Sequence, residues 1–448
     1  MYFKRILIAN RGEIARRIMK TCKKLGIETV AVYSDADKEA PHVQDADLAV
    51  HIGAAQAKDS YLNIPKMIEA AKQTNADAIH PGYGFLAENS EFAKRCDEEG
   101  ITFIGPSPEH ICLMGNKVEA RKKMAEAGVP VVPGWDGNLQ SVEQAVEVAE
   151  DLGYPLMLKA SLGGGGIGME RVNHADELEK VFASTMKKAE SFFGDSRLFL
   201  EKYIENPRHI EVQVICDHHG KAIHLFEREC SIQRRNQKII EESPSPYLTS
   251  ALRAELCKTA VQGAQSIGYA NVGTMEFIFD EDKNYYFLEM NTRLQVEHPV
   301  TEEVTGQDIV EWQIKIAAKE PLNINQSDIQ MKGHAIENRL CAEDPVTFFP
   351  SPGKIEELKL PSEIARFDFA VTEGNIVSPF YDPMIGKIIV YGENRETAIQ
   401  KMKQTLKQIN ITGIKTTLPL LQDILDSEQF RNGNYTTKFI ENHFEVKV

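Results

Sequence analysis

Several features that would assign the chain to other protein classes are missing from its 448 residues. No apolar run is long enough to cross a bilayer, and the seven cysteines are scattered without a CxxC pair. This cysteine usage argues against a disulfide framework or a zinc site and favours free thiols in a reducing compartment. Basic residues number 51 against 66 acidic ones, a net charge of −15 that disfavours non-specific nucleic-acid binding. We therefore expect a cytoplasmic globular protein with neither a membrane nor a nucleic acid as partner.

The order of apolar segments predicts the architecture. The length calls for two to four domains. Residues 5–9, 28–33 and 101–104 are typical of short buried strands, and a helical pattern between the first two ends near Gly26. This rhythm predicts a parallel α/β domain over about the first hundred residues, with its opening apolar run as a buried strand rather than a signal peptide. The loop NRGE lacks the later glycines of a dinucleotide fingerprint.

Downstream, the pattern changes to mixed and antiparallel structure. A helix is expected at 116–127, and a small mobile subdomain at 155–215. Antiparallel strands with one helix are expected at 211–290, and a last α+β segment from 350 contains a helical pattern at 396–409.

The segment 273–302 contains the most informative pattern. Two strand-like runs flank EDKN (281–284), a composition that suits a four-residue hairpin loop and pairs Asp280 with Tyr285. That register places Glu276 opposite Glu289. Like charges facing each other across strands are destabilising, and a divalent cation such as magnesium between them would remove the penalty.

Further polar residues follow on odd positions after this hairpin. Asn291 lies two residues beyond Glu289 and shares its face if the chain is extended. With continued extension, Arg293, Gln295 and Glu297 join the same face. A solvated edge strand is the alternative explanation, but acids flanked by apolar residues favour a site.

Lysine and glycine residues suggest an anion site elsewhere. Lys159 stands in an apolar run before Gly163–Gly166, where a lysine and backbone N–H groups would hold phosphates; a surface hairpin is the alternative. The segment 200–211 is either a simple linker or a place where Glu201 and the backbone hold an adenine. The basic cluster at 227–242 has a salt-bridged surface as its default interpretation and an anion site as the alternative; it comprises Arg228, Arg234, Arg235 and Lys238.

These segments, taken in order, resemble the ATP-grasp superfamily and, within it, the biotin carboxylases. The resemblance covers essentially the whole chain and rests on these motifs: ANRGEIA (9–15), HPGYGFLAEN (80–89), KASLGGGGIGM (159–169), EKYIENPRHIE (201–211), CSIQRR (230–235), EMNTRLQVEHPVTE (289–302), AEDP (342–345), PSPGKI (350–355) and YDPMIGK (381–387). It implies an ATP-grasp fold of α/β and α+β class. A Rossmann-like domain is expected at 1–114, an ATP-grasp domain at 115–330 with a lid at about 131–203, and a C-terminal α+β domain at 331–448.

The resemblance also implies roles for individual residues. ATP would be bound by Lys117, Lys159, Gly164, Gly165, Gly166, Glu201, Tyr203, Ile204, His209, Gln233, Glu276 and Glu289. Magnesium (or manganese) would be held by Glu276 and Glu289, with Asn291 beside them. Bicarbonate would be bound by Lys238, Arg293, Gln295 and Val296. Glu297 would be the general base, and Arg339 would stabilise the biotin enolate; Lys238 and Arg293 complete the catalytic set.

The implied reaction is carboxylation of biotin by bicarbonate through carboxyphosphate, with ATP converted to ADP and phosphate. Biotin would be borne by a separate carrier protein, since QKMKQ (400–404) only superficially resembles the biotin-accepting motif. A carboxyltransferase would be a further partner, and the chain is expected to form a homodimer. We expect the first half-reaction of an acetyl-CoA carboxylase in fatty acid synthesis, with pyruvate, propionyl-CoA and other acyl-CoA carboxylases as alternatives. Another ATP-grasp ligase and a regulatory ATP-binding protein are the competing functions.

Three positions depart from the family pattern. Asn236 replaces a common histidine, and Ile167 replaces a basic residue of the glycine loop, so both bear on nucleotide affinity. Lys20 and Lys24 make the first helix more basic where the dimer contact is expected.

Overall fold

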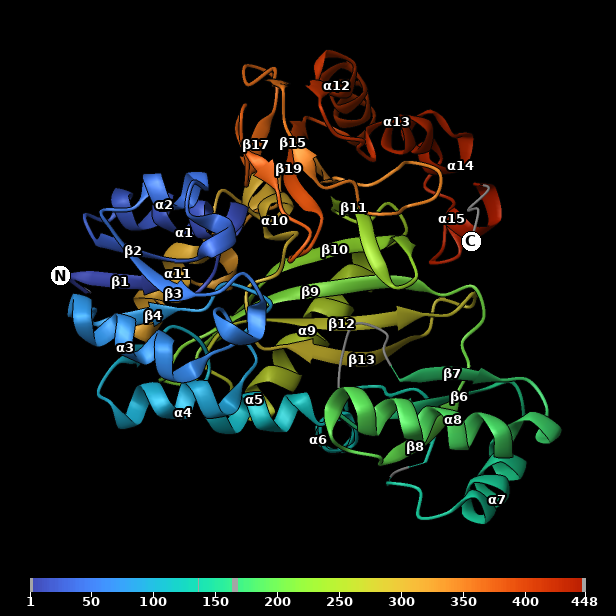
Figure 1. Cartoon of the computed structure of the whole chain (residues 1–448). Helices are drawn as coiled ribbons and strands as arrows, with labels where there is room; N and C mark the ends of the chain where they lie inside the picture. The colour runs from blue at the N-terminus through green and yellow to red at the C-terminus, as the bar shows by residue number, and fades with distance from the viewer. Residues whose placement is uncertain (1–2, 136, 163–167, 445–448) are drawn as a thin grey trace.

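The computed structural model describes residues 3–135, 137–162 and 168–444. Its N-terminal part is a parallel sheet with strand order β3-β2-β1-β4-β5, flanked by helices (Figure 1). The elements of this part are β1 (Arg5–Ile8), α1 (Gly12–Lys24), β2 (Glu28–Ser34), η1 (Asp35–Asp37), α2 (Pro41–Asp45), β3 (Leu48–Gly53), η2 (Ala57–Asp59), α3 (Ile64–Thr74), β4 (Ala78–His80), α4 (Ser90–Glu98) and β5 (Thr102–Phe103). The predicted parallel α/β arrangement is confirmed. Helix α1 buries Ile14, Ile18 and Cys22, which recur at the four-residue spacing that forms one helix face.

The centre of the molecule is an eight-stranded sheet with strand order β13-β12-β9-β10-β11-β14-β19-β17. Its strands are β9 (Arg208–Cys216), β10 (Ala222–Arg234), β11 (Gln237–Ser243), β12 (Asn271–Phe279), β13 (Tyr285–Asn291), β14 (His334–Cys341), β17 (Arg366–Phe369) and β19 (Met384–Gly392). The pairings within this sheet are antiparallel. The predicted antiparallel strands and the single helix among them, α9 (Ser250–Ser266), are confirmed. Because β14, β17 and β19 continue the sheet, the central and C-terminal parts of the chain share one layer.

A smaller sheet with order β7-β6-β8 lies beside the central one and carries two helices on one side (Figure 1). Its elements are α7 (Val142–Leu152), β6 (Leu156–Ala160), β7 (Met169–Val172), α8 (Ala175–Phe193) and β8 (Leu198–Lys202). This subdomain has its own apolar core, in which Leu156 and Leu158 of β6 pack with Leu178 of α8. The helix expected at 116–127 is α6 (Lys117–Glu126), whose N-cap side chain, Asn116, accepts hydrogen bonds from two backbone N–H groups.

The remaining helices connect the parts. α5 (Pro108–Gly115) leads out of the N-terminal sheet, and α10 (His298–Thr305) and α11 (Ile309–Ala317) follow β13. Apolar residues of α11 such as Ile309 and Val310 pack in one core with Ile6 and Ile8 of β1, which attaches the N-terminal sheet to the central part. The C-terminal elements are η3 (Gln326–Asp328), β15 (Gly353–Lys354), β16 (Glu357–Lys359), β18 (Ile376–Val377), α12 (Arg395–Gln408), β20 (Asn410–Thr412), α13 (Leu418–Asp426), α14 (Glu428–Arg431) and α15 (Phe439–His443).

Two sequence-based expectations about this region need comment. The helix predicted at 396–409 is confirmed by α12. Over the described ranges, the structure holds no helix that is both long enough and apolar enough to span a bilayer.

Candidate functional site

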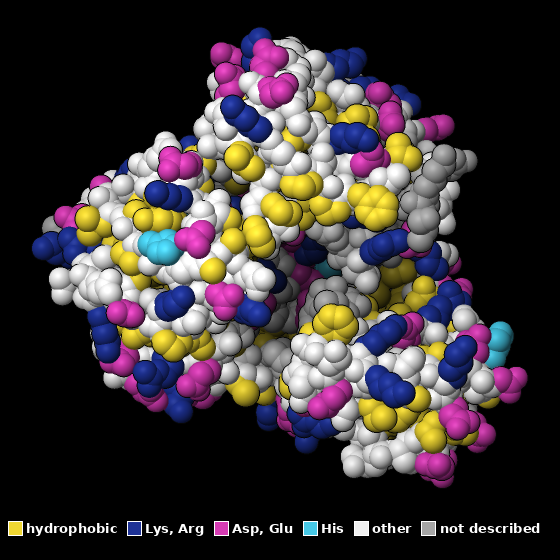
Figure 2. Space-filling model, viewed as in Figure 1, with side chains coloured by type: hydrophobic (Ala, Val, Ile, Leu, Met, Phe, Trp, Pro, Cys, Tyr) yellow, Lys and Arg dark blue, Asp and Glu magenta, His cyan; other side chains and the backbone are white. Residues whose placement is uncertain are grey.

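Two adjoining cavities of about 470 and 300 Å³ lie where the three parts of the molecule meet. Figure 2 shows the hollow between the N-terminal part at left, the C-terminal part above and the small subdomain at lower right. The larger cavity is lined by Lys117, His209, Gln233, Lys238, Glu276, Glu289, Asn291, Arg293, Gln295, Val296, Glu297 and Arg339. The smaller one is lined by Lys159, Glu201, Tyr203 and Ile204, and shares His209 and Gln233 with the first. The remaining candidates, Gly164 to Gly166, and also Ile167, lie outside the described residues.

The hairpin β12–β13 brings Glu276 opposite Glu289, as predicted, but the predicted register at the loop is wrong. Phe279, not Asp280, pairs with Tyr285, which lengthens the loop by one residue. An irregularity after Glu276 leaves Leu288 without a partner and restores the opposition of the two acids. A β-bulge has no clear signal in the sequence, and two errors of one residue cancelled.

The two facing carboxylates are stabilised by different cations. Lys117 at the start of α6 donates to Oε2 of Glu289 at 2.9 Å. Glu276 accepts from Lys238 at 3.0 Å and from Asn291 at 2.8 Å, and its other oxygen lies 2.7 Å from Nε2 of His209. Burial by itself would raise the pKa of Glu276, but Lys238 and His209 outweigh it and hold that pKa well below its usual range.

Lys238 is the centre of the charged cluster. Its Nζ atom donates to Glu211 at 2.6 Å, to Glu297 at 2.7 Å and to Glu276. Burial would lower the pKa of this lysine, but the three carboxylates together raise it well above its ordinary value. The ammonium group is therefore charged, and it offers a positive centre at the edge of the larger cavity.

Glu297 is the N-cap residue of α10, and its side chain turns back into the cavity. Oε1 accepts from Lys238, and Oε2 accepts from Nη2 of Arg339 at 3.0 Å. Burial would raise the pKa of Glu297, but Lys238 and Arg339 outweigh it and lower that pKa. The carboxylate is therefore ionised and able to accept a proton.

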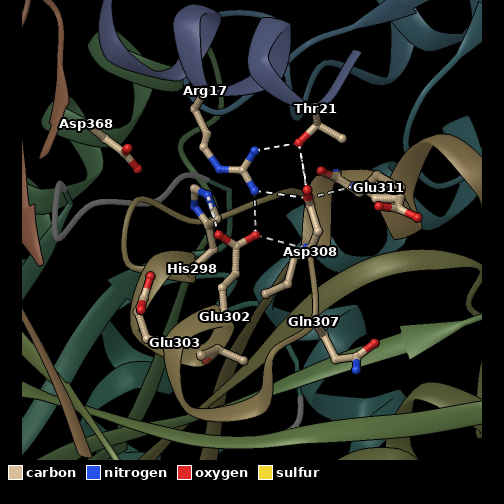
Figure 3. A network of polar contacts seen from close by, with 12 residues as sticks. Arg17, Thr21, His298, Glu302, Glu303, Gln307, Asp308, Glu311 and Asp368 are labelled. Atoms are coloured by element: carbon tan, nitrogen blue, oxygen red, sulfur yellow. Dashed lines mark hydrogen bonds and ion pairs between the residues drawn. The ribbon is translucent and has the colours of Figure 1, made fainter. Parts of the chain in front are cut away.

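The far end of α10 is attached to two other parts of the chain. Glu302 accepts from Arg17 of α1 at 2.6 Å and from Arg366 of β17 at 2.9 Å. In Figure 3, Arg17 reaches from α1 to Glu302 and to Asp308, which also accepts from Thr21. Since α10 is a single short helix, these buried contacts fix the direction in which Glu297 projects from its first turn.

Residues after Asn291 do not continue as an extended strand, so the prediction of a common strand face beyond this point is wrong. The strand β13 ends at Asn291, and turns lead to α10. Arg293 nevertheless reaches back to Oδ1 of Asn291 at 2.8 Å, and Gln295 donates to Glu276 at 2.6 Å. The backbone carbonyl of Val296 accepts from Lys387. The tertiary fold thus brings together the residues that strand alternation was expected to align.

The basic cluster at 227–242 is not a salt-bridged surface, which corrects the default interpretation. Arg228 is completely buried and donates to Glu211 at 2.6 Å and to Gln295 at 2.6 Å. A fully buried arginine requires buried acceptors, and these are the groups that also bound the cavity. Arg228 and Glu211 were not among the residues selected from the sequence, although Glu211 shares its strand face with His209 on β9.

The smaller cavity contains the residues expected near a nucleotide base. Lys159 of β6 forms an ion pair with Glu201 of β8, and the two strands are hydrogen-bonded neighbours. Residues from the C-terminal end of the chain, Thr437 and Lys438, also line this cavity. They are some 230 residues away from Glu201 in the sequence, and no local pattern indicates their approach.

Asn236 lines both cavities and lies in the two-residue turn between β10 and β11. Its φ is +66° and that of Arg235 is +50°. Such turns require positive φ at both positions, and asparagine tolerates this conformation better than most residues. The departure from histidine at this position is thus compatible with the hairpin.

Comparison with known proteins agrees with this geometry along the whole chain. The N-terminal domain family of biotin carboxylase matches residues 2–111, the ATP-binding domain family of the carbamoyl-phosphate synthase L chain matches 116–325, and the biotin carboxylase C-terminal domain family matches 337–442. A biotin carboxylase of Halalkalibacterium halodurans is 56% identical over 447 residues, covering 100% of this chain and 99% of that protein. The chain belongs to the biotin carboxylase family.

Solved biotin carboxylase structures superpose closely on this one. The Campylobacter jejuni enzyme, solved as a β,γ-ATP complex, has a TM-score of 0.97 and 48% identity, covering 98% of this chain and 99% of that one. The biotin carboxylase domain dimer of the 2-oxoglutarate carboxylase of Hydrogenobacter thermophilus was solved with MgADP, ADP and bicarbonate. It has a TM-score of 0.96 and 49% identity, covering 99% of this chain and 98% of that one. As biotin carboxylases, these proteins are ATP-dependent ligases, which confirms the predicted class of enzyme and fold.

Proposed function

We propose that this chain transfers the carboxyl group of bicarbonate to biotin, using ATP and magnesium (or manganese) and forming carboxyphosphate on the way to ADP and phosphate. The observation that supports it is the contact of Glu297 with both Lys238 and Arg339 at the wall of the larger cavity. A base, a cation for an anionic substrate and a second cation for a developing enolate stand within hydrogen-bond reach of one another.

ATP is assigned to the two adjoining cavities. Glu201 and the backbone of Tyr203 and Ile204 bind the adenine in the smaller cavity, next to Gln233, which lines both. The lysine side chains of Lys117 and Lys159, with His209, contact the phosphates. Their support is their position: Lys117 and Lys159 enter from α6 and β6 on either side of the shared wall.

The oxygen donors of Glu276, Glu289 and Asn291 fit a magnesium ion. Carboxylate and amide oxygens are hard ligands, and the two acids face each other across the hairpin. Magnesium would supply charge compensation for the phosphate oxygens. In the structure the ammonium groups of Lys117 and Lys238 neutralise these acids, which shows that the donor set requires a positive charge.

Bicarbonate is assigned to the groups around Lys238: Arg293, Gln295 and the backbone of Val296. Because Lys238 lowers the pKa of Glu297, its proton affinity depends on where that ammonium group is engaged. An anion that draws Lys238 toward itself raises the basicity of Glu297 at the moment of binding. Glu297 then removes the bicarbonate proton, and the dianion attacks the γ-phosphate.

Water must be kept from carboxyphosphate, which hydrolyses readily. The subdomain of β6, β7 and β8, part of the lid assigned to about 131–203, covers the nucleotide cavity through Met157 and Met169. Arg339, from β14 on the opposite side, is assigned to the biotin enolate during carboxyl transfer.

The final acceptor belongs to the finer part of the proposal. We assign the chain to the first half-reaction of an acetyl-CoA carboxylase, in fatty acid synthesis, with biotin on a separate carrier protein and a separate carboxyltransferase. Pyruvate, propionyl-CoA or another acyl-CoA is the alternative acceptor, since the similar Hydrogenobacter domain belongs to a 2-oxoglutarate carboxylase. The acceptor is chosen by the carboxyltransferase, so the site described above serves each of these reactions equally.

A homodimer is also proposed, with α1 near the contact. Lys24 lies 2.9 Å from Glu311 and 3.9 Å from Asp308 of the same chain, so its charge is compensated internally. The basic character of α1 therefore places little repulsion at a two-fold contact. Sedimentation at micromolar concentration distinguishes a dimer of about 100 kDa, twice the 50.3 kDa chain, from a monomer.

The decisive experiment is transfer of labelled bicarbonate to free biotin by the purified chain with ATP and magnesium. Acid-labile label on biotin supports the proposal. Bicarbonate-dependent phosphate release without labelled biotin would restrict the activity to carboxyphosphate formation. Bound ATP with neither product would contradict the proposed function and favour a regulatory ATP-binding protein.

A further inference from the structure

One face of the central sheet carries four ionisable side chains directly behind the site. The register pairs Glu241 of β11 with Glu337 of β14, and Arg339 of β14 with Lys387 of β19. Because side chains alternate along a strand, these four residues share one face. Helix α10, which begins at Glu297, packs on the same three strands. The cluster therefore lies between the sheet and the helix that presents the proposed base.

Arg339 is held from two sides within this cluster. Its Nε atom donates to Oε1 of Glu241 at 2.6 Å, and its Nη2 atom donates to Oε2 of Glu297 at 3.0 Å. A guanidinium group is planar and rigid, so an acceptor at one edge fixes the direction of the other edge. Glu241, completely buried, thereby orients the donor that faces Glu297.

The neighbouring Glu337 does not serve Arg339 in the same way. It is completely buried, and both its oxygens lack a hydrogen-bond partner within the described part of the chain, as does Oε2 of Glu241. Two buried carboxylates on directly opposed positions repel each other unless one is protonated. Burial raises the pKa of Glu337 well above its ordinary value and that of Glu241 to about 7.

The other charged groups at this face are already engaged. Lys387 donates to the backbone carbonyl of Val296 at 2.8 Å and lies 3.3 Å from Glu13 of α1. Its side chain is completely buried, so these contacts fix its position. One cation, Arg339, thus remains for three nearby acids, Glu241, Glu297 and Glu337. A proton on Glu337 balances this face and provides a donor beside the unpartnered oxygen of Glu241.

We propose that Glu241 is a positioning residue for the carboxylation of biotin, which orients Arg339 toward Glu297 and the biotin site, and that Glu337 supports it as a neutral carboxylic acid. The inference rests on the proposed function, in which Arg339 acts on the biotin enolate. Without the charge of Glu241, the guanidinium group turns entirely to Glu297 and leaves the position that the enolate needs.

The test compares Glu241→Gln with the wild-type protein in three assays: carboxylation of free biotin, bicarbonate-dependent ATP hydrolysis without biotin, and ATP binding. We expect kcat for biotin carboxylation to fall by about 10- to 100-fold, since misplacing a reacting group by about 1 Å has such effects. The KM for bicarbonate and the dissociation constant of ATP stay within about twofold, because Glu241 touches neither ligand's assigned residues except through Arg339.

Two variants separate positioning from general damage. Glu242→Gln removes a buried, ion-paired carboxylate from the same strand but from the opposite face, where it contacts His334 and Arg395. It is expected to reduce stability and to leave kcat within about twofold. Glu337→Gln, an isostere of the protonated acid, keeps activity within about threefold and removes an infrared band of a protonated carboxyl group.

Each outcome has a defined meaning. An inactive wild-type protein contradicts the proposed function itself, whereas an active wild-type with an equally active Glu241→Gln variant contradicts only the positioning role. Equal losses in the Glu241→Gln and Glu242→Gln variants also overturn it, because both would then reflect packing. Loss of carboxylation in Glu337→Gln beyond tenfold overturns the neutral state assigned to Glu337.

Discussion

The Nζ atom of Lys238 lies 2.7 Å from Oε1 of Glu297, and this contact connects substrate binding to the strength of the base. The same ammonium group holds Glu211 and Glu276, so one lysine compensates three buried acids. An anion entering the cavity competes with these acids for Lys238. The proton affinity of Glu297 is consequently lowest in the empty site and rises when bicarbonate binds.

Replacing Glu297 by glutamine should abolish proton removal from bicarbonate while leaving nucleotide binding intact. The amide keeps the size of the side chain but has little basicity, and general-base catalysis contributes about 10²- to 10⁴-fold. We expect bicarbonate-dependent phosphate release to fall by at least about 100-fold and the calorimetric ATP affinity to be unchanged. Unchanged turnover would remove Glu297 from the mechanism.

Replacing Lys238 by glutamine should chiefly weaken the use of bicarbonate. The variant loses the cation that faces the substrate and leaves three carboxylates to repel an anion. We expect the KM for bicarbonate to rise by about 10- to 100-fold, equivalent to about 1.5–3 kcal/mol for a charged hydrogen bond. Lys117→Gln is the control, since its loss should instead weaken ATP binding. A fall in ATP affinity alone for Lys238→Gln would disprove the role given to it.

Removing the divalent cation, or one of its proposed ligands, should affect the metal requirement specifically. Chelation should abolish turnover, and added magnesium or manganese should restore it. Glu289→Gln should raise the magnesium concentration for half-maximal activity by about tenfold or more, because a charged oxygen ligand is lost. Glu281→Gln, in the loop of the same hairpin, is the matched control and should change nothing. An identical magnesium dependence in both variants would exclude Glu289 as a ligand.

Stability should depend on acid through Glu242. Burial by itself would raise its pKa, but Arg395 and His334 outweigh it and lower the pKa from 4.5 to about 2. A carboxyl group with a lower pKa in the folded state stabilises the fold above its unfolded pKa, and this contribution is lost as the pH falls through the folded pKa. The two and a half pKa units correspond to about 3 kcal/mol at pH 7.

The measurement is urea unfolding of the wild type and Glu242→Gln from pH 7 down to pH 3. The difference in free energy of unfolding should be about 3 kcal/mol at pH 7 and should shrink steadily below pH 4.5. Glu28→Gln, at a half-exposed position in an ion pair with Arg5, is the comparison and should show little difference at any pH. A difference for Glu242→Gln that does not change with pH would show that packing, not charge, is lost.

Much of the local structure follows from short-range patterns. The apolar runs of β1 and β2, the spacing of α1 and the cap of α6 by Asn116 are properties of neighbouring residues, and each was predicted correctly. The opposition of Glu276 and Glu289 was also predicted, although the register reached it through a bulge at Leu288. These features depend on interactions within some 15 residues, for which periodicity and turn chemistry are sufficient.

The site itself was decided by tertiary structure wherever distant segments meet. The strand β14 places Arg339 beside Glu297, Arg228 is buried rather than exposed, and Lys438 reaches the nucleotide cavity from the end of the chain. The sequence by itself determined which residue types are present and which local elements carry them. Only the folded chain decided their partners, because burial and long-range strand pairing set which charges must neutralise one another.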